Sequence, residues 1–440
     1  MKLKKTIELK GGDFPPIVRV FWNQAPANFK VPTLLSTMVL LSVLCGRLRV
    51  KYIYDAELHA ILLQVIVVAN SSEGKSFNRT LHKRLMRPLL ERDEALRREE
   101  QKYDELKNTK SKNKDLPPEP ISDVRCVQRI TLNKLIKRSD MIVRKWGEPL
   151  PLAFYCEELS ALTEGNKSAY GDLRTLGRLA FDLGSEISSD TCYSGSYNAR
   201  VDVIWSSLFN CTRDALDQYI GKKGLLGGNA QRIVPVFFPD MMGEEAPIFP
   251  PLTAEQQAMI DTTVDNLMLQ TYNTDGKSLC PLHDVPMAWL DKDVRSWCKQ
   301  HREEIAKTGS RALNCFYKRS SVIAFRMAAL CYYLWGEDTV RQRNVRRIYW
   351  FLADYIVKAQ MDCWGMEYEK LLAKQDRGEQ KPKPTLYDQI PPQFTRAQLD
   401  AKMKDLELTT PVRVMLCLWQ KNGLIHKLED SETEVFEKNF

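Results

Sequence analysis

The chain is organised around the stretch Ile61-Leu-Leu-Gln-Val-Ile-Val-Val-Ala-Asn-Ser-Ser-Glu-Gly-Lys-Ser76. Its first half, residues 61–68, is apolar and largely β-branched, which is typical of a buried strand in a parallel sheet. Residues 77–90, which follow the stretch, have the pattern of a helix. A strand, a loop ending in Gly74-Lys75-Ser76 and a helix form the context of a phosphate-binding P-loop.

The predicted loop carries the groups that a nucleoside triphosphate requires. Backbone N–H groups and a helix N-terminus would face the phosphate oxygens, Lys75 would reach the outer phosphates, and the Ser76 hydroxyl would help to hold Mg²⁺. The residues expected to bind ATP are Ala69, Ser72, Glu73, Gly74, Lys75 and Ser76. Ala69 stands where the motif has its first glycine, so a tighter loop is expected. The alternative is an ordinary strand–helix turn that contains Gly-Lys-Ser by coincidence.

Composition indicates a globular protein of two or three domains: 440 residues, 44% of them hydrophobic and 27% charged. The net charge of +8 permits a nucleic-acid partner without requiring one. Residues 1–12 lack the apolar segment of a signal peptide, and the apolar run at residues 31–45 is too short to span a membrane. A buried helix is expected there. The 11 cysteines form no repeated framework, so a reduced, cytoplasmic setting is expected.

A second informative stretch, Leu150–Glu158, is a hydrophobic run that ends in two adjacent carboxylates. P-loop ATPases place their metal-holding and water-activating acids after such a strand. Glu157 is therefore the predicted magnesium ligand, at a position usually held by aspartate, and Glu158 the predicted general base. By itself, an apolar run followed by two glutamates also marks an ordinary strand end.

Two later residues are candidates for contacting phosphate. Asn210 follows a predicted buried strand at residues 201–209 and would contact the γ-phosphate or the attacking water. Arg232 follows a glycine-rich segment and precedes a predicted strand at residues 233–238. It is the predicted arginine finger, acting on the nucleotide of a neighbouring subunit in a homo-oligomer. The alternatives are a polar strand-end cap and a plain surface arginine.

A hairpin is predicted over residues 190–202, between the acidic pair and Asn210. Tyr193 and Tyr197 flank its turn and Arg200 follows, so these side chains could stack on bases and bind phosphate of single-stranded DNA. The alternative is a surface hairpin whose tyrosines pack on their own sheet.

Together these stretches resemble an uncharacterised family of P-loop, helicase-like ATPases from mobile genetic elements of gut bacteria. The resemblance covers roughly residues 14–360 and is carried by Phe14-Pro15-Pro16, the strand into Ala69–Ser76, Arg87-Pro88-Leu89-Leu90 with its charged helix, Glu157-Glu158-Leu159-Ser160 and the lead into Arg232. Family members more usually have glycine at position 69 and aspartate at position 157. The resemblance implies an ATPase of replication or mobilisation. Members commonly follow a primase-like module. None precedes these residues, so any primase is expected to be a separate protein.

Three further features have weaker interpretations. The pairs Cys280/His283 and Cys298/His301 have zinc-ligand spacing, but residues 294–306 look like one helix, so zinc is not favoured. Arg319 and Arg326 would either approach the nucleotide from a helical lid or form packing salt bridges. Residues 394–440 have a helix–turn–helix pattern followed by Gly423-Leu-Ile425, similar to a winged helix.

The sequence therefore predicts a three-layer α/β P-loop ATPase core of the AAA+/RecA-like kind, with ATP and Mg²⁺ as cofactors and DNA as partner. The predicted parts are an N-terminal helical cap (1–60), the core (61–240) with a charged helical arm (91–120), a helical lid (241–369), a linker (370–393) and a winged-helix-like module (394–440). The leading function is an ATP-driven DNA motor or loader. The alternatives are a regulatory or scaffold protein that binds ATP with little turnover, and a DNA-binding regulator that acts through the C-terminal module.

Overall fold

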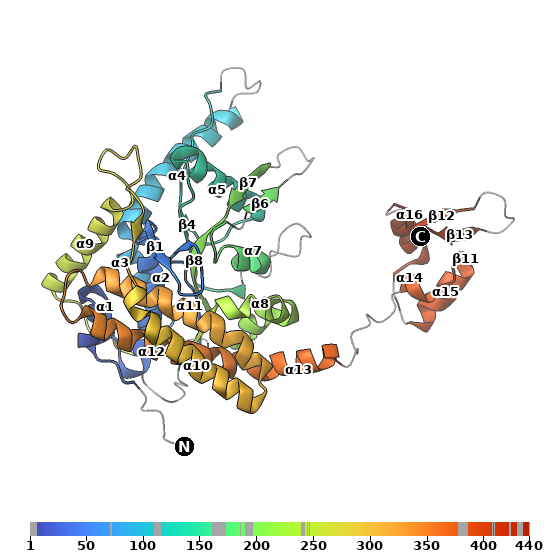
Figure 1. The fold of residues 1–440 in the computed structure, drawn as a ribbon. Helices are drawn as coiled ribbons and strands as arrows, with labels where there is room; N and C mark the ends of the chain where they lie inside the picture. Colours follow the sequence, from blue (N-terminus) through green and yellow to red (C-terminus); the bar gives the residue numbers. More distant parts are fainter. Residues whose placement is uncertain are drawn as a thin grey trace. The chain divides into compact units, whose positions relative to one another are not determined.

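The computed structural model contains two compact units, residues 1–369 and 370–440, which are described separately (Figure 1). The structure describes residues 7–70, 73–109, 116–160, 173–184, 186–189, 197–238, 243, 245, 247–376, 386–406, 408, 410–421, 424–428 and 434–439. The predicted boundary at residue 369 coincides with the division between the units. The predicted cap, core and lid lie together in the first unit.

The first unit is built on a five-stranded, all-parallel sheet with strand order β4-β5-β8-β3-β9. The strands are β3 (Gln64–Val68), β4 (Cys126–Val127), β5 (Leu152–Cys156), β8 (Trp205–Cys211) and β9 (Val234–Phe237). Residues of β3, β5 and β8 are all buried, as expected for strands covered on both faces. The α/β class and the predicted parallel sheet are therefore confirmed.

Strand β8 comes late in the chain but lies between β3 and β5. In its register with β3, Val67 lies opposite Asn210, and Val68 lies opposite Cys211. In its register with β5, Cys156 lies opposite Phe209. The segments that follow β3, β5 and β8 therefore leave the same edge of the sheet side by side.

Helix α2 (Lys30–Leu44) packs against β3 and β8 and has 13 buried residues. It anchors to the sheet through a 2.8 Å hydrogen bond between the hydroxyls of Ser42 and Ser206. The segment Ala27–Leu44 is long and apolar enough to cross a membrane, but 78% of it is buried inside the unit, as in the core helix of a soluble protein. The predicted buried helix is thus present.

The remaining elements around the sheet are mostly helical. Helix α5 begins after Thr131, whose hydroxyl accepts a hydrogen bond from the main-chain N–H of Lys134 and so caps the helix. The elements are α1 (Pro16–Gln24), α3 (Phe77–Leu85), α4 (Arg87–Thr109), α5 (Leu132–Trp146), α7 (Leu173–Leu179) and α8 (Arg213–Leu226), with small strands β1 (Leu48–Lys51), β2 (Leu58–Ala60), β6 (Glu186–Ser189), β7 (Ala199–Asp202) and β10 (His283–Asp284).

The part of the first unit that follows β9 is a layer of helices, which packs on the rest of that unit. Helix α11 (Arg311–Leu334) is buried over much of its length and runs beside α12 (Arg341–Gln360) in Figure 1. The other helices of this layer are α9 (Ala254–Leu269) and α10 (Asp291–Thr308). After α12, a π-helical turn at Met361–Gly365 leads into α13 (Met366–Asp376), which crosses the division between the two units.

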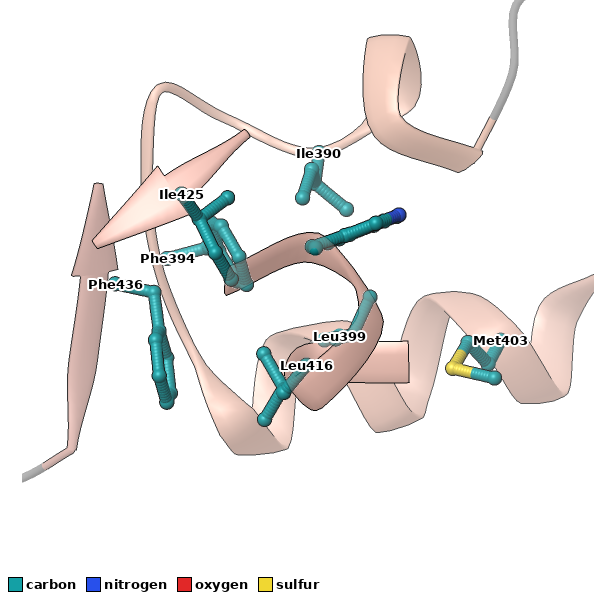
Figure 2. Close-up of a cluster of buried hydrophobic side chains, with 8 residues drawn as sticks. Ile390, Phe394, Leu399, Met403, Leu416, Ile425 and Phe436 are labelled. Atoms are coloured by element: carbon teal, nitrogen blue, oxygen red, sulfur yellow. The ribbon is translucent and has the colours of Figure 1, made fainter. Parts of the chain in front are cut away.

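The second unit has the element order helix, strand, two helices, two strands. These are α14 (Leu386–Gln389), β11 (Gln393–Thr395), α15 (Arg396–Asp405), α16 (Val412–Lys421), β12 (Ile425–Lys427) and β13 (Val435–Lys438), and the antiparallel sheet has the order β11-β13-β12. Figure 2 shows its core, to which Ile390 contributes. Because Leu386 and Tyr387 also pack on this core, the module begins about eight residues before the predicted start at residue 394.

Candidate functional site at the carboxyl edge of the sheet

The Gly74-Lys75-Ser76 loop connects β3 to α3, as predicted. The Lys75 ammonium donates to the carbonyl of Ala69 at 3.0 Å and to that of Cys211 at 3.4 Å. These carbonyls end β3 and β8, so the positive charge lies where ligands bind in open α/β sheets. Ser76 is exposed immediately before the first residue of α3.

Gly74 is required by its surroundings. Its φ of +83° is in the left-handed region, and a Cβ there would lie 2.8 Å from Cγ of Pro247 and 3.6 Å from Phe29. The loop is therefore packed closely against the segment that begins at Pro247.

The side chain of Glu73 forms hydrogen bonds with the residue at the start of the loop. The Glu73 carboxylate accepts hydrogen bonds from the main-chain N–H of Asn70 at 2.6 Å and from its side-chain amide at 2.8 Å. Ala69 is buried at the end of β3, where its N–H donates to Cys211. Ser72 lies outside the described residues.

The two glutamates follow β5 directly, and both are exposed. Arg79, on α3, donates from Nε to Glu157 at 2.7 Å, and this hydrogen bond together with the charge of Arg79 holds the pKa of Glu157 below its usual value. Beside Glu158, the N–H of Leu159 donates to the main-chain carbonyl of Asn210 at 2.9 Å. This contact fixes the acidic pair next to the end of β8.

Asn210 is buried, and its side chain is oriented by a residue that the sequence analysis missed. The amide of Asn78 donates to Oδ1 of Asn210 at 2.6 Å, and both side chains are almost fully buried. Asn78 and Arg79 lie in the first turn of α3, and each contacts a predicted site residue. Their position directly after Gly-Lys-Ser was the available signal, since the first turn of that helix borders the neighbouring strand ends.

The oxygen donors at this edge suit a hard cation. Mg²⁺ prefers hydroxyl and carboxylate oxygens and usually keeps waters and substrate phosphate oxygens as further ligands. Ser76 and Glu157 could supply the two protein oxygens, provided that Glu157 releases Arg79. Within the described residues, no group of three or more His, Cys, Asp or Glu side chains lies close enough together to hold a metal ion.

Of the two Cys-x₂-His pairs, Cys298 and His301 lie on helix α10, whereas Cys280 precedes β10 and His283 is the first residue of that strand. His301 packs on the Trp297 ring at a centroid distance of 3.9 Å, and the Cys298 thiol contacts the Ser321 hydroxyl. Cys280 contacts the carbonyl of Leu269 and is partly exposed.

Arg232 lies at the other end of the sheet, because it precedes β9 and enters that strand at its amino end. It is largely buried, with its guanidinium 3.0 Å from the carbonyl of Gly228 and 3.8 Å from Asp182. Burial lowers the pKa of Arg232 to about 10. Lys75 and Arg232 are therefore not brought together within one chain. A role at a neighbouring subunit stays a prediction, and it would require this ion pair to open.

Asp182 also receives the two arginines of the predicted lid. Arg326 is buried and donates to Asp182 and to the Phe181 carbonyl, each at 2.8 Å, while Arg319 approaches Asp182 at 3.6 Å. Burial raises the pKa of Asp182, but the charges of Arg326 and Arg319 outweigh it and hold the pKa below its usual value. In this structure the two lid arginines form packing ion pairs, the second of the two predicted alternatives.

A hairpin is present, but it begins before the predicted residue 190: β6 (Glu186–Ser189) pairs antiparallel with β7 (Ala199–Asp202). Its turn, with Tyr193, lies outside the described residues. Tyr197 packs on α5: its N–H donates to Asn133 at 3.0 Å, and its hydroxyl donates to Asp140. Burial and that hydrogen bond raise the pKa of Tyr197 to about 12. Arg200 is exposed and pairs with Glu186 across the hairpin. Arg200 therefore lies within reach of a ligand, whereas Tyr197 has a structural role.

The buried side chain of His82, on α3, makes the stability of the fold depend on pH. It stacks on Tyr155 at a centroid distance of 4.2 Å, and burial lowers its pKa from 6.5 to about 4. As the pH falls from 6.5 towards 4, the unfolded chain takes up a proton that the folded chain excludes, so stability is lost over this range. The loss amounts to roughly 3 kcal/mol. Urea unfolding should show a shallower pH slope for His82→Gln, and equal slopes would contradict this assignment.

A search against protein-family models and a search of curated protein sequences both found no match for the chain.

Proposed function

We propose that the chain binds and hydrolyses ATP at the carboxyl edge of its parallel sheet. One observation carries the proposal: the Lys75 ammonium, the buried Asn210 and the acidic pair occupy the ends of three adjacent strands, β3, β8 and β5. A cation for phosphate, an oriented amide and a carboxylate base are the groups that phosphoryl transfer to water requires.

The position of each residue at this edge of the sheet indicates its role. The Lys75 ammonium and the main-chain N–H groups at the start of α3 would bind the β- and γ-phosphates. Glu158 would accept a proton from the attacking water, and Asn210, held by Asn78, would orient that water or the γ-phosphate. Bound Mg²⁺ would neutralise charge on the phosphate oxygens, with Ser76 and Glu157 as its protein ligands.

As the finer assignment we propose a DNA-dependent motor or loader that works in the cytoplasm as a homo-oligomer, following the family that the sequence resembles. Charge supports a DNA path on the first unit, because residues 1–369 carry 52 Lys or Arg and 45 Asp or Glu. The exposed Arg200, on the hairpin between the acidic pair and Asn210, supports a path close to the hydrolysis site.

Steady-state ATP hydrolysis with and without single-stranded DNA tests this assignment. Stimulation by DNA is expected for the wild-type chain. Because Tyr197 packs on α5, the test variant changes only Tyr193 and Arg200 to Ala and should keep basal hydrolysis while losing most of the stimulation. Glu186→Gln, which frees Arg200 without removing its charge, is the matched control. Full stimulation in the double variant would place the DNA path elsewhere.

A second candidate, ATP binding with little turnover, is favoured by the ion pair between Arg79 and Glu157. While it persists, this pair engages the carboxylate that would otherwise serve Mg²⁺. Stoichiometric ATP binding by a wild-type chain that releases no phosphate would select this function over the motor.

The C-terminal unit gives less support to a DNA-binding regulator. Its element order and its β11-β13-β12 sheet support a winged-helix-like fold. However, residues 386–440 carry seven Lys or Arg and nine Asp or Glu, and the second helix of the pair, α16, exposes Val414 and Leu418. A net charge of −2 provides little attraction for phosphate. A DNA footprint that survives Lys75→Ala would favour the regulator.

A further inference from the structure

A cavity of about 960 Å³ opens beside the Gly74-Lys75-Ser76 loop. One side is formed by the loop and by α3, including Lys75 and Arg79; the other is formed by α1, α2 and residues 247–257. Its volume lies in the range of small-molecule sites, and it is larger than a triphosphate group alone requires. The phosphate loop therefore borders a space suited to the rest of a ligand.

The wall away from Lys75 is aromatic and apolar. Phe249 is partly exposed and stacks on Phe77, with ring centroids 5.4 Å apart and an interplanar angle of 7°. Phe29 makes edge contacts with both rings, its centroid 5.7 Å from that of Phe249 and 6.0 Å from that of Phe77. Pro250 and Pro251 continue this wall. Flat apolar faces of this kind suit an aromatic ring system.

Two glutamines that line the cavity are held by the main chain. The Gln24 amide donates to the Pro250 carbonyl at 2.6 Å, and the Gln257 amide donates to the Leu252 carbonyl at 3.2 Å. Because these contacts fix both side chains, the 247–252 segment keeps its place beside the loop.

Thr33 supplies an independent sign of a ligand. Its side chain lines the cavity and is almost fully buried, yet its hydroxyl has no hydrogen-bond partner among the described residues. A buried hydroxyl without a partner costs free energy, which a ligand that supplies a donor or acceptor would recover. Thr37, one turn further along α2, also has a buried and unpartnered hydroxyl but does not line the cavity.

We propose that this cavity binds the base and sugar of a nucleoside triphosphate, with the base against Phe249 and a polar group of the nucleoside bonded to the Thr33 hydroxyl. The inference rests on the proposed function, because the triphosphate must lie on Lys75 for the nucleoside to enter this space. It goes further by locating the base and sugar in this cavity and by naming Phe249 and Thr33 as the residues that contact them.

Competition binding of ATP and of inorganic tripolyphosphate to the full chain tests the inference. Wild-type protein should bind ATP at least tenfold more tightly than tripolyphosphate. Phe249→Ala should lose about tenfold in ATP affinity and Thr33→Val about fivefold, with tripolyphosphate binding unchanged. Thr37→Val, the matched control, should bind both ligands as the wild type does. Phe249→Leu, which keeps an apolar side chain, guards against a folding defect and should lose part of the ATP affinity only.

The outcomes separate the inference from the proposed function. Equal affinity of the wild type for the two ligands, or equal losses for both in Phe249→Ala and Phe249→Leu, would overturn the nucleoside site and leave the phosphate site standing. Failure of the wild type to bind either ligand would overturn the proposed function and the inference with it.

Discussion

Lys75→Ala is expected to weaken ATP binding by about a hundredfold or more, because a buried phosphate charge would lose its only predicted lysine partner. The ammonium already lies at the ends of β3 and β8, held there by two carbonyl oxygens. Those contacts place the charge without neutralising it, so it is available for phosphate. Titration with a fluorescent ATP analogue measures the effect directly.

Lys83→Ala is the matched control for this change. Lys83 is exposed on α3, the helix that follows the loop, and does not line the cavity beside the loop. The Lys83→Ala variant removes the same charge from a position eight residues further along the chain and should leave ATP affinity within twofold of wild type. If Lys75→Ala binds ATP as tightly as Lys83→Ala does, the loop is an ordinary strand–helix turn.

Glu158→Gln is expected to keep ATP binding and to lower turnover by about 10²–10⁴-fold, since an amide cannot accept a proton from water. The residue is exposed beside Asn210, whose carbonyl fixes the next residue of the chain. The change preserves size and hydrogen bonding, so the fold should be unaffected. Phosphate release at saturating ATP, measured together with equilibrium binding, separates the two effects.

Glu157→Gln provides the comparison, because Glu157 is the predicted ligand of Mg²⁺ rather than the base. Its turnover should be partly restored by raised Mg²⁺, whereas that of Glu158→Gln should not. Unchanged turnover in Glu158→Gln together with complete loss in Glu157→Gln would exchange the two roles.

The local patterns of the sequence were sufficient to predict the elements that carry the site. The β-branched run before Gly74 formed β3, and the hydrophobic run before Glu157 formed β5. Both predictions depend on periodicity and on turn residues, which act within a few positions of the chain. The order of strands, with β8 between β3 and β5, depends on contacts between distant segments and had no local signal.

The location of Arg232 in the fold was not predicted, for a different reason. The prediction relied on the glycines before it, although the strand that follows it already implied the amino edge of a parallel sheet. Its partner Asp182 comes from a segment about fifty residues earlier, so the ion pair was not visible in the pattern around Arg232. The structural role of Tyr197 was similarly hidden, because its partners lie on α5, more than fifty residues before Tyr197 in the chain.

Asn78 and Arg79 were missed because polar residues in the first turn of a helix are common, and their position after Gly-Lys-Ser does not by itself identify the residues that they contact. Only the packing of α3 against the ends of β5 and β8 gives them a function, Asn78 on Asn210 and Arg79 on Glu157. Thr33 was missed for the same reason, since a threonine within an apolar helix shows no sign of the cavity it lines.

A crystal structure of the full chain with a non-hydrolysable ATP analogue and Mg²⁺ tests the central claim most directly. The account predicts the triphosphate on the main-chain N–H groups before α3, with the γ-phosphate within 3.2 Å or so of the Lys75 ammonium and Glu157 released from Arg79. Nucleotide bound at any other place, with Lys75 still bonded only to the carbonyls of Ala69 and Cys211, would contradict it.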